Sequence, residues 1–157
     1  ESNANARSLA FAQKADAEGW GRSGSFFRAA ARAKQVRSER FAKVIKKLGG
    51  VPIAKIEMPV VKSTAENYKA MLDNAVYESM SMYPGFLAKA KKDNIKDAID
   101  AFEQAGKLAA MRATIFNWIL ARVDFYVCPV CGNVVGSTNF QTCPICGESK
   151  IKFMAVK

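Results

Sequence analysis

The sequence predicts a mainly α-helical fold, in which four long helices form a bundle with one long crossover and a small β-ribbon metal domain follows. Apolar residues recur at helical spacing through roughly the first 120 residues, in long segments separated by few glycines and prolines. All four cysteines lie in the last thirty residues, as two Cys-x-x-Cys pairs. We therefore expect the bundle to span residues 1–123 and the metal domain residues 124–157.

The composition permits a sizeable core and excludes some chemistry. Half of the 157 residues are apolar, and histidine is absent, which excludes histidine acid–base catalysis and histidine-ligated metals. No apolar run is long enough to cross a membrane and no signal peptide is visible, so we expect a cytoplasmic protein.

The chain is basic, with 24 Lys and Arg against 14 Asp and Glu and a net charge of +10. Such a balance permits binding to nucleic acid or another anionic surface. The basic residues are spread along the predicted helices, so solvated helix faces explain them and nucleic-acid binding is not favoured.

The first two predicted helices are joined by a turn at residues 19–24. Residues 1–18 are rich in alanine and contain no helix breaker, and a second helix runs from Ser25 to Leu48 and stops at two glycines. Its inward seam advances in steps of three and four through Phe27, Ala30, Lys34, Arg37, Phe41, Val44 and Leu48. Lys34 and Arg37 break the apolar pattern of this seam.

A connection over residues 49–62 is long enough to run from one end of the bundle to the other. Ser63-Thr-Ala-Glu66 is typical of a capping box that opens the third helix. This helix carries its seam on Tyr68, Leu72, Ala75, Met82 and Phe86, and Pro84 is expected to kink it or to end its first segment.

The fourth predicted helix runs from Ile95 to Val123, after a turn at Asp93-Asn94. Its seam comprises Ile99, Phe102, Ala109, Phe116, Leu120 and Val123, and Arg112 lies one turn beyond Ala109. Residues 124–127 are strand-like, and the alternating tail at residues 151–156 is expected to pair with them.

Cys128, Cys131, Cys143 and Cys146 form two equivalent turns, each followed by a glycine. Two such turns facing each other make a tetrahedral four-sulfur site, which suits either iron or zinc. The paired spacing and the lack of secretory features argue against disulfides. The spacing alone leaves the choice between iron and zinc open.

The order of these segments resembles the rubrerythrin family, which joins a ferritin-like four-helix bundle to a rubredoxin-like domain. The resemblance covers nearly the whole chain and is carried by residues 1–16, Phe27-Arg-Ala-Ala-Ala31, Ser63-Thr-Ala-Glu-Asn67, Met82-Tyr-Pro84 and Tyr126-Val-Cys-Pro-Val-Cys-Gly132. The resemblance implies peroxide reduction at a non-haem diiron site. It also implies one iron in the four-cysteine site, protein redox partners and a homodimer, and it favours iron over zinc.

The residues that would ligate a diiron centre are largely replaced in this sequence. The family pattern needs Glu on the first helix, Glu-x-x-His on the second and fourth, and Glu-x-x-Glu on the third. Carried onto this chain, these positions are Glu1, Lys34, Arg37, Ala75, Glu78, Ala109 and Arg112. Two carboxylates cannot hold two irons, so we expect neither a diiron centre nor catalytic residues in the bundle.

The three cations suggest what replaces the metals. Five glutamates and two ferrous ions carry a net charge of −1, whereas Glu1 and Glu78 with Lys34, Arg37 and Arg112 carry +1. We expect a salt-bridged, metal-free core. Two alternatives remain. In the first, these cationic side chains extend to solvent through a loosened bundle. In the second, their surplus positive charge binds a small anion inside the bundle. Tyr83, which matches a family tyrosine near the diiron site, is expected to be a core residue.

Three functions are compatible with this pattern. An iron ion held by the four cysteines would carry single electrons between other proteins, because the acceptor site within the bundle is lost. Alternatively, zinc would hold a non-enzymatic structural or interaction protein together, with a basic docking surface. In the third, the family's peroxidase activity would be retained through other chemistry, but no pair of residues in the sequence supports this. Whether the protein is an enzyme therefore stays open at this stage.

Overall fold

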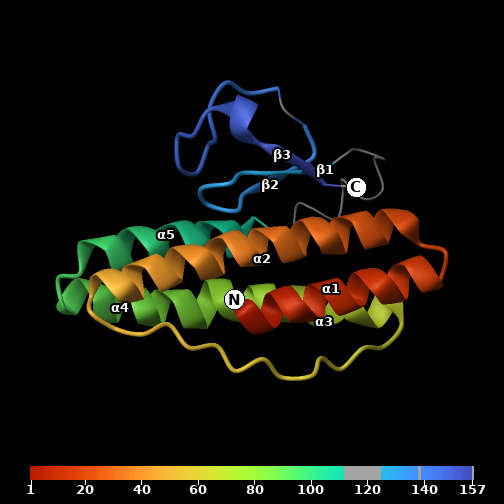
Figure 1. Cartoon of the computed structure of the whole chain (residues 1–157), viewed down its shortest axis with the longest axis horizontal. Helices are drawn as coiled ribbons and strands as arrows, with labels where there is room; N and C mark the ends of the chain where they lie inside the picture. Colours follow the sequence, from red (N-terminus) through yellow and green to blue (C-terminus); the bar gives the residue numbers. More distant parts are fainter. Residues whose placement is uncertain (112–124, 138, 157) are drawn as a thin grey trace.

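The computed structural model describes residues 1–111, 125–137 and 139–156, and it confirms the predicted fold class (Figure 1). The bundle contains α1 (Ser2–Ala17), α2 (Gly21–Lys47), α3 (Thr64–Tyr77), the π-helix η1 (Glu78–Met82), α4 (Tyr83–Lys92) and α5 (Lys96–Ala110). The metal domain contains β1 (Phe125–Val127), β2 (Val134–Val135), the short 3₁₀-helix η2 (Lys150–Lys152) and β3 (Met154–Val156).

Helix α2 begins at Gly21, one turn before the predicted start at Ser25. A single residue, Gly19, reverses the chain with a φ of +78°, so the remaining glycines of this segment are free to enter the helix. A Cβ atom at Gly24 would meet the carboxylate of Asp16, which is exposed and can rotate away, so this contact does not by itself require glycine. The predicted turn is therefore mostly the first turn of α2.

In the predicted seam of α2, Phe27, Lys34 and Arg37 are buried and Ala30 is half-buried, whereas Leu48 at the end is 58% exposed. The first turn of α1 lies opposite Ser38, whose hydroxyl is 2.7 Å from that of Ser2. Beyond this level, α2 has no α1 neighbour among the described residues. The prediction that Leu48 faces the core was wrong for this reason.

The capping box of the third helix is confirmed. The Ser63 hydroxyl accepts a hydrogen bond from the Glu66 backbone N–H, and the Glu66 carboxylate accepts one from the Ser63 backbone N–H. Pro84 does not end the helix, which loosens into η1 and continues as α4. The wider π-turn accommodates a proline that cannot donate to the preceding turn.

The π-turn also changes which residues face the core after it. One extra residue in a helix rotates the following positions by about 100°. Tyr83 is consequently buried and Phe86 is 49% exposed, so the prediction of Phe86 as a seam residue was wrong.

The strands form an antiparallel sheet in the order β2-β1-β3, with Val127 opposite Met154. The predicted pairing of the tail is confirmed, although residues 150–152 turn as η2 and are not extended. Phe125 and Val127 join the core residues Phe26, Phe27 and Ala33 of α2. The sheet therefore packs on the bundle over α2, and the crossover runs along the opposite side (Figure 1).

The later part of the fourth predicted helix lies outside the described residues. Phe116, Leu120, Val123, the domain boundary at residues 123–124 and Arg112 all fall in this segment. Among the described helices, none combines the length and the apolar character that a membrane span requires.

Candidate metal centre and buried ion-pair cluster

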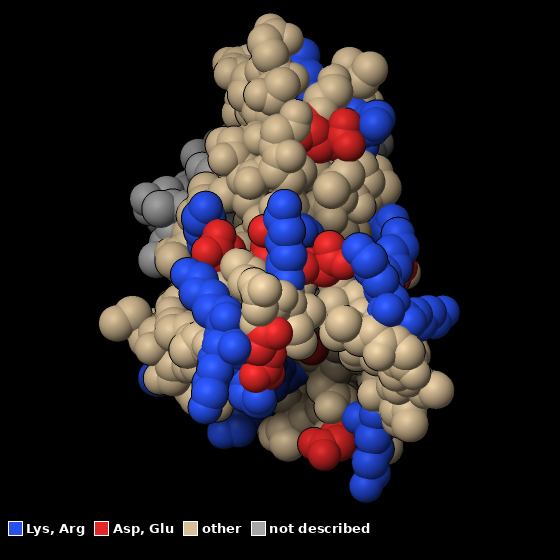
Figure 2. All heavy atoms as spheres, turned by 90° about the vertical axis from the view of Figure 1, so that its left-hand side faces the viewer, with Lys and Arg blue, Asp and Glu red and all other residues tan. Residues whose placement is uncertain are grey.

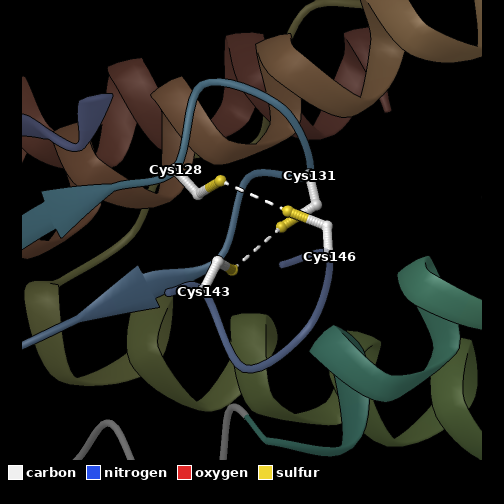
Figure 3. Close-up of side chains that lie close together, drawn as sticks. All are labelled: Cys128, Cys131, Cys143 and Cys146. Carbon is white, nitrogen blue, oxygen red and sulfur yellow. Dashed lines mark hydrogen bonds between the residues drawn. The ribbon is translucent and has the colours of Figure 1, made fainter. Parts of the chain in front are cut away.

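The four cysteines converge on one point between the two turns (Figure 3). Their sulfur atoms all lie within 4.8 Å of one another, and Cys128–Cys146 and Cys131–Cys143 are each separated by 3.7 Å. Sulfurs of a tetrahedral site with metal–sulfur bonds of about 2.3 Å are about 3.8 Å apart, so the geometry fits one metal ion. The same distances exclude disulfides, whose sulfurs are about 2.05 Å apart.

The two turns are built alike. Gly132 and Gly147 have φ values of +74° and +77°, and each donates its N–H to the carbonyl of the first cysteine of its pair. The next backbone N–H donates to sulfur, from Asn133 to Cys131 and from Glu148 to Cys146. Backbone N–H groups directed at sulfur stabilise thiolate ligands, as both iron and zinc require.

Hydrogen bonding distributes charge within the cysteine cluster. The hydrogen bond with Cys131 lowers the pKa of the Cys128 thiol, whereas the same bond raises the pKa of Cys131. Burial raises the pKa of Cys146 to about 11. A bound metal cation would favour the thiolate form of its sulfur ligands and so offset the raised pKa values of Cys131 and Cys146.

The first cysteine turn docks directly on the bundle. A Cβ atom on Gly132 would lie 2.6 Å from the backbone oxygen of Ala33 in α2, so this close contact requires glycine. Leu108 of α5 packs against Cys128, Cys131 and Cys143. Apolar packing of this kind shields the metal position from water.

A cluster of ion pairs lies inside the bundle. The Lys34 Nζ atom is 2.6 Å and 2.9 Å from the two carboxylate oxygens of Glu78, and 3.3 Å from Oε2 of Glu1. Arg37 donates from Nε to Oε1 of Glu1 at 3.1 Å. All four side chains are nearly fully buried, with exposed fractions of 5–6%.

Two further side chains donate to the carboxylates, whereas Oε2 of Glu1 is buried without a hydrogen bond and has only its ion pair with Lys34. Asn74 donates to Glu78 at 2.7 Å, and the Tyr83 hydroxyl donates to Glu1. Burial, followed by the charge of Glu1, raises the pKa of Tyr83 far above its usual range. Burial alone would raise the pKa of Glu1, but Arg37 and then Lys34 lower it more strongly, so the net pKa is well below the ordinary value.

Arg37 connects the ion-pair cluster to the cysteine turn. Its Nη1 group donates to the carbonyl oxygen of Gly132 at 3.3 Å, while its Nε group holds Glu1. The residue after the second cysteine ligand is thus bonded to the side chain that neutralises the buried carboxylate.

The structure brings together four of the seven positions singled out in the bundle, namely Glu1, Lys34, Arg37 and Glu78. Ala75 and Ala109 are buried alanines, with 4% and 3% exposure, and Arg112 lies outside the described residues. Sequence reasoning missed the contribution of Asn74, although its place one turn before Glu78 put both on one helix face. It also missed the contact between Arg37 and Gly132, because no local pattern links residues 95 positions apart.

A helical bundle of ferritin-like topology that carries a rubredoxin-like site of four cysteines defines the structural class of this protein. No family model matches the chain. Nigerythrin of Nitratidesulfovibrio vulgaris is 29% identical over 141 residues, which are 85% of this chain and 70% of that protein. Rubrerythrin of Porphyromonas gingivalis is 27% identical over 150 residues, covering 87% of this chain and 74% of that protein.

Solved structures agree with the sequence relatives. The fully reduced, all-ferrous state of nigerythrin superposes with a TM-score of 0.86 at 28% identity, covering 98% of this chain and 80% of that chain. Its mixed-valent state gives a TM-score of 0.82 over the same shares. In sequence, fold and four-cysteine site, the chain is therefore similar to proteins of the rubrerythrin family.

Proposed function

We propose that this protein is a rubrerythrin-like iron protein that carries single electrons through iron bound by its four cysteines, and that a salt-bridged cluster replaces the diiron centre. One observation carries the second half of the proposal. The ammonium group of Lys34 bonds both oxygens of Glu78 and faces Glu1, and these are the two carboxylates that remain at the family's ligand positions.

Electrostatics support the loss of the diiron centre. Glu1 and Glu78 balance Lys34 and Arg37, so this cluster of four is neutral without a metal. A divalent ion would have to displace the ammonium group from 2.6 Å and leave two cations buried without counter-charges, which costs several kcal/mol. Alanine at positions 75 and 109 supplies no ligand.

The four-cysteine site has the features that an electron carrier needs. Iron in such a site supplies a one-electron Fe(III)/Fe(II) couple. The four cysteines hold the metal position, the Asn133 and Glu148 N–H groups bond the sulfurs, and Leu108 excludes water from one side. Cys146 is the cysteine that is partly exposed, so redox partner proteins would approach from its side.

The alternative of a basic docking surface is less well supported. Figure 2 shows that Lys and Arg side chains on one end of the molecule are interleaved with Asp and Glu side chains. Lysines of α2 and α4 form ion pairs, as in Lys47–Asp97, Lys89–Asp93 and Lys91–Glu103. Neutralised lysines attract an acidic partner weakly.

Spectroelectrochemistry of the iron-loaded protein tests the proposed function. We expect thiolate-to-iron absorption bands that bleach and return reversibly with one electron per chain, and no rapid reoxidation of the reduced protein by hydrogen peroxide. Rapid reoxidation with two-electron stoichiometry would overturn the proposal. Irreversible loss of iron on cycling, with stable binding of zinc, would instead favour the structural role.

We propose in addition that two copies of the chain associate, as the family resemblance implies. Apolar side chains of the crossover face outward, and Ile53 and Met58 are 87% and 93% exposed. The side chain of Asn3 bonds the Lys55 carbonyl and the Glu57 N–H, which holds this extended segment against α1. An ordered apolar strip of this kind supports an interface.

A further inference from the structure

A partly enclosed cavity lies between the bundle and the first cysteine turn. Its volume is about 40 Å³. A water molecule needs roughly 10–15 Å³ on the same measure, so the cavity has room for about three non-hydrogen atoms. Helices α1, α2, α3 and α5 and the segment from Gly132 to Val134 contribute to its wall.

The ionisable residues in this wall share one sign. Among the described residues that line the cavity, these are Arg7, Lys34 and Arg37, and no carboxylate joins them. The polar neutral side chains are those of Ser8, Asn74 and Asn133. A cavity that holds only water does not require an excess of cationic over anionic side chains in its wall.

Two of these cationic side chains have N–H groups without a hydrogen-bond partner in the described part of the chain. Arg7 makes no ion pair or side-chain hydrogen bond with any residue in the described part of the chain. Arg37 uses Nε for Glu1 and Nη1 for Gly132, which leaves its Nη2 group without a partner among these residues. Buried guanidinium groups are normally satisfied by acceptors, so this one points to an acceptor that occupies the cavity.

Charge counting gives the sign of that acceptor. Lys34 and Arg37 pair with the carboxylates of Glu1 and Glu78, and Arg7 is a third cation that lines the cavity, so these five groups together carry one surplus positive charge. The carboxylates are engaged by Lys34, Arg37, Asn74 and Tyr83 and do not line the cavity.

We infer that this cavity is a binding site for a small monovalent anion, a halide or an oxyanion of at most about three non-hydrogen atoms, held between Arg7 and Arg37. The anion completes the charge balance of the bundle core beside the cysteine turn. The inference does not depend on the proposed electron-transfer function, because it concerns protein groups that are the same with iron or zinc in the four-cysteine site.

Anion titrations of the metal-loaded protein at constant ionic strength test the inference. Chloride and formate fit the cavity, and we expect each to raise the melting temperature in a saturable way. Sulfate, with its four oxygens around sulfur, is too large, so it should give no saturable rise. Equal stabilisation by all three anions would be a general salt effect and would overturn the inference.

Variants locate the site. Arg7→Gln should weaken chloride binding about tenfold or more, because a charge-assisted contact is lost. Lys43→Gln removes an exposed cation of α2 and should leave chloride binding unchanged. If Arg7→Gln does not fold, Ser8→Asp, which adds a negative charge to the cavity wall away from the cysteine site, should abolish the chloride response.

A crystal soaked in bromide gives the direct view. An anomalous peak between Arg7 and Arg37 is expected, and it should be lost in Arg7→Gln or Ser8→Asp. Saturable chloride binding that neither variant changes, or bromide found only on the outer surface, would contradict the assignment of this cavity.

Discussion

At the scale of single residues, Lys34 lies at the centre of the buried ion-pair cluster of the bundle. Its ammonium group bonds the oxygens of Glu78 and faces Glu1, and its exposed fraction is 6%. A buried ion pair adds little net stability compared with apolar packing, but removal of one partner leaves an uncompensated charge. The free energy of unfolding should therefore fall when a substitution removes the charge of only one member of the cluster.

Glu78→Gln is expected to destabilise the protein by about 3–5 kcal/mol, because it keeps the shape of the side chain and leaves Lys34 with half of its counter-charge. Urea unfolding at equal metal content measures this change. The matched control is Asp73→Asn, which breaks the exposed pair with Lys69 and should leave the unfolding midpoint nearly unchanged. An unaltered midpoint in Glu78→Gln would show that the cluster is not a stabilising core.

The low pKa of Glu1 predicts a pH dependence. Because the folded-state pKa lies below the ordinary value of 4.5, the ionised carboxylate stabilises the fold fully above that pH, and this contribution is lost as the pH falls below it. The stability difference between the wild type and Glu1→Ala should be constant from about pH 7 to about pH 5.5 and should narrow toward about pH 3. A difference that is constant or widens over the acid range would contradict the assignment.

Sequence reasoning reached much of this residue-level arrangement. The positions of Lys34 and Arg37 followed from a seam with steps of three and four. Glu78 was singled out by the ligand pattern that the family resemblance implies, and a salt-bridged core was expected from the opposite charges at these positions. The cavity beside Arg7 could not be predicted, because Arg7 lies on α1 and carries no pattern that separates it from a solvated arginine. Packing in three dimensions decides which arginines face a void.

At the scale of elements, the contact between the first cysteine turn and α2 fixes the metal domain on the bundle. Gly132 and Gly147 occupy equivalent places in the two turns and have nearly equal φ values. They differ in their surroundings, since a Cβ on Gly132 meets the Ala33 carbonyl and a Cβ on Gly147 meets nothing within 4 Å. Alanine substitutions at these two glycines therefore distinguish the cost of a strained backbone from the cost of losing the contact with α2.

Gly147→Ala should cost about 1–2 kcal/mol from the left-handed backbone alone. Gly132→Ala carries the same strain and also forces the turn away from α2, so it should cost clearly more and should make the metal domain more sensitive to proteolysis. Unfolding experiments and limited proteolysis on the two variants at equal metal content measure the difference. Equal effects would mean that the close contact with Ala33 does not hold the domain.

Element boundaries show the limits of sequence patterns. The capping box located the start of the third helix, because two reciprocal hydrogen bonds encode it locally. The expected burial of Tyr83 is confirmed, but the π-turn before Pro84 was not predicted, and the single residue that it inserts turns Phe86 away from the core. A helical period cannot reveal an inserted residue when several nearby positions are apolar.

At the scale of the whole molecule, the crossover places an apolar strip on the outside. If two copies associate through this strip, the double variant Ile53→Lys/Met58→Lys should shift the protein to a monomer in light scattering coupled to size-exclusion chromatography. Ile151→Lys, at a similarly exposed position of the metal domain, is the control and should remain a dimer. A wild-type protein that is monomeric at all accessible concentrations would exclude this association.

The central claim is that the chain retains one metal site of the two kinds that the family resemblance implies. The most direct test is metal analysis of anaerobically purified protein from iron-replete cells, together with its visible spectrum. We predict one iron per chain and thiolate-to-iron bands that bleach on reduction. About three irons per chain would contradict the account, because the cluster of Glu1, Lys34, Arg37 and Glu78 would then have to open and hold two irons.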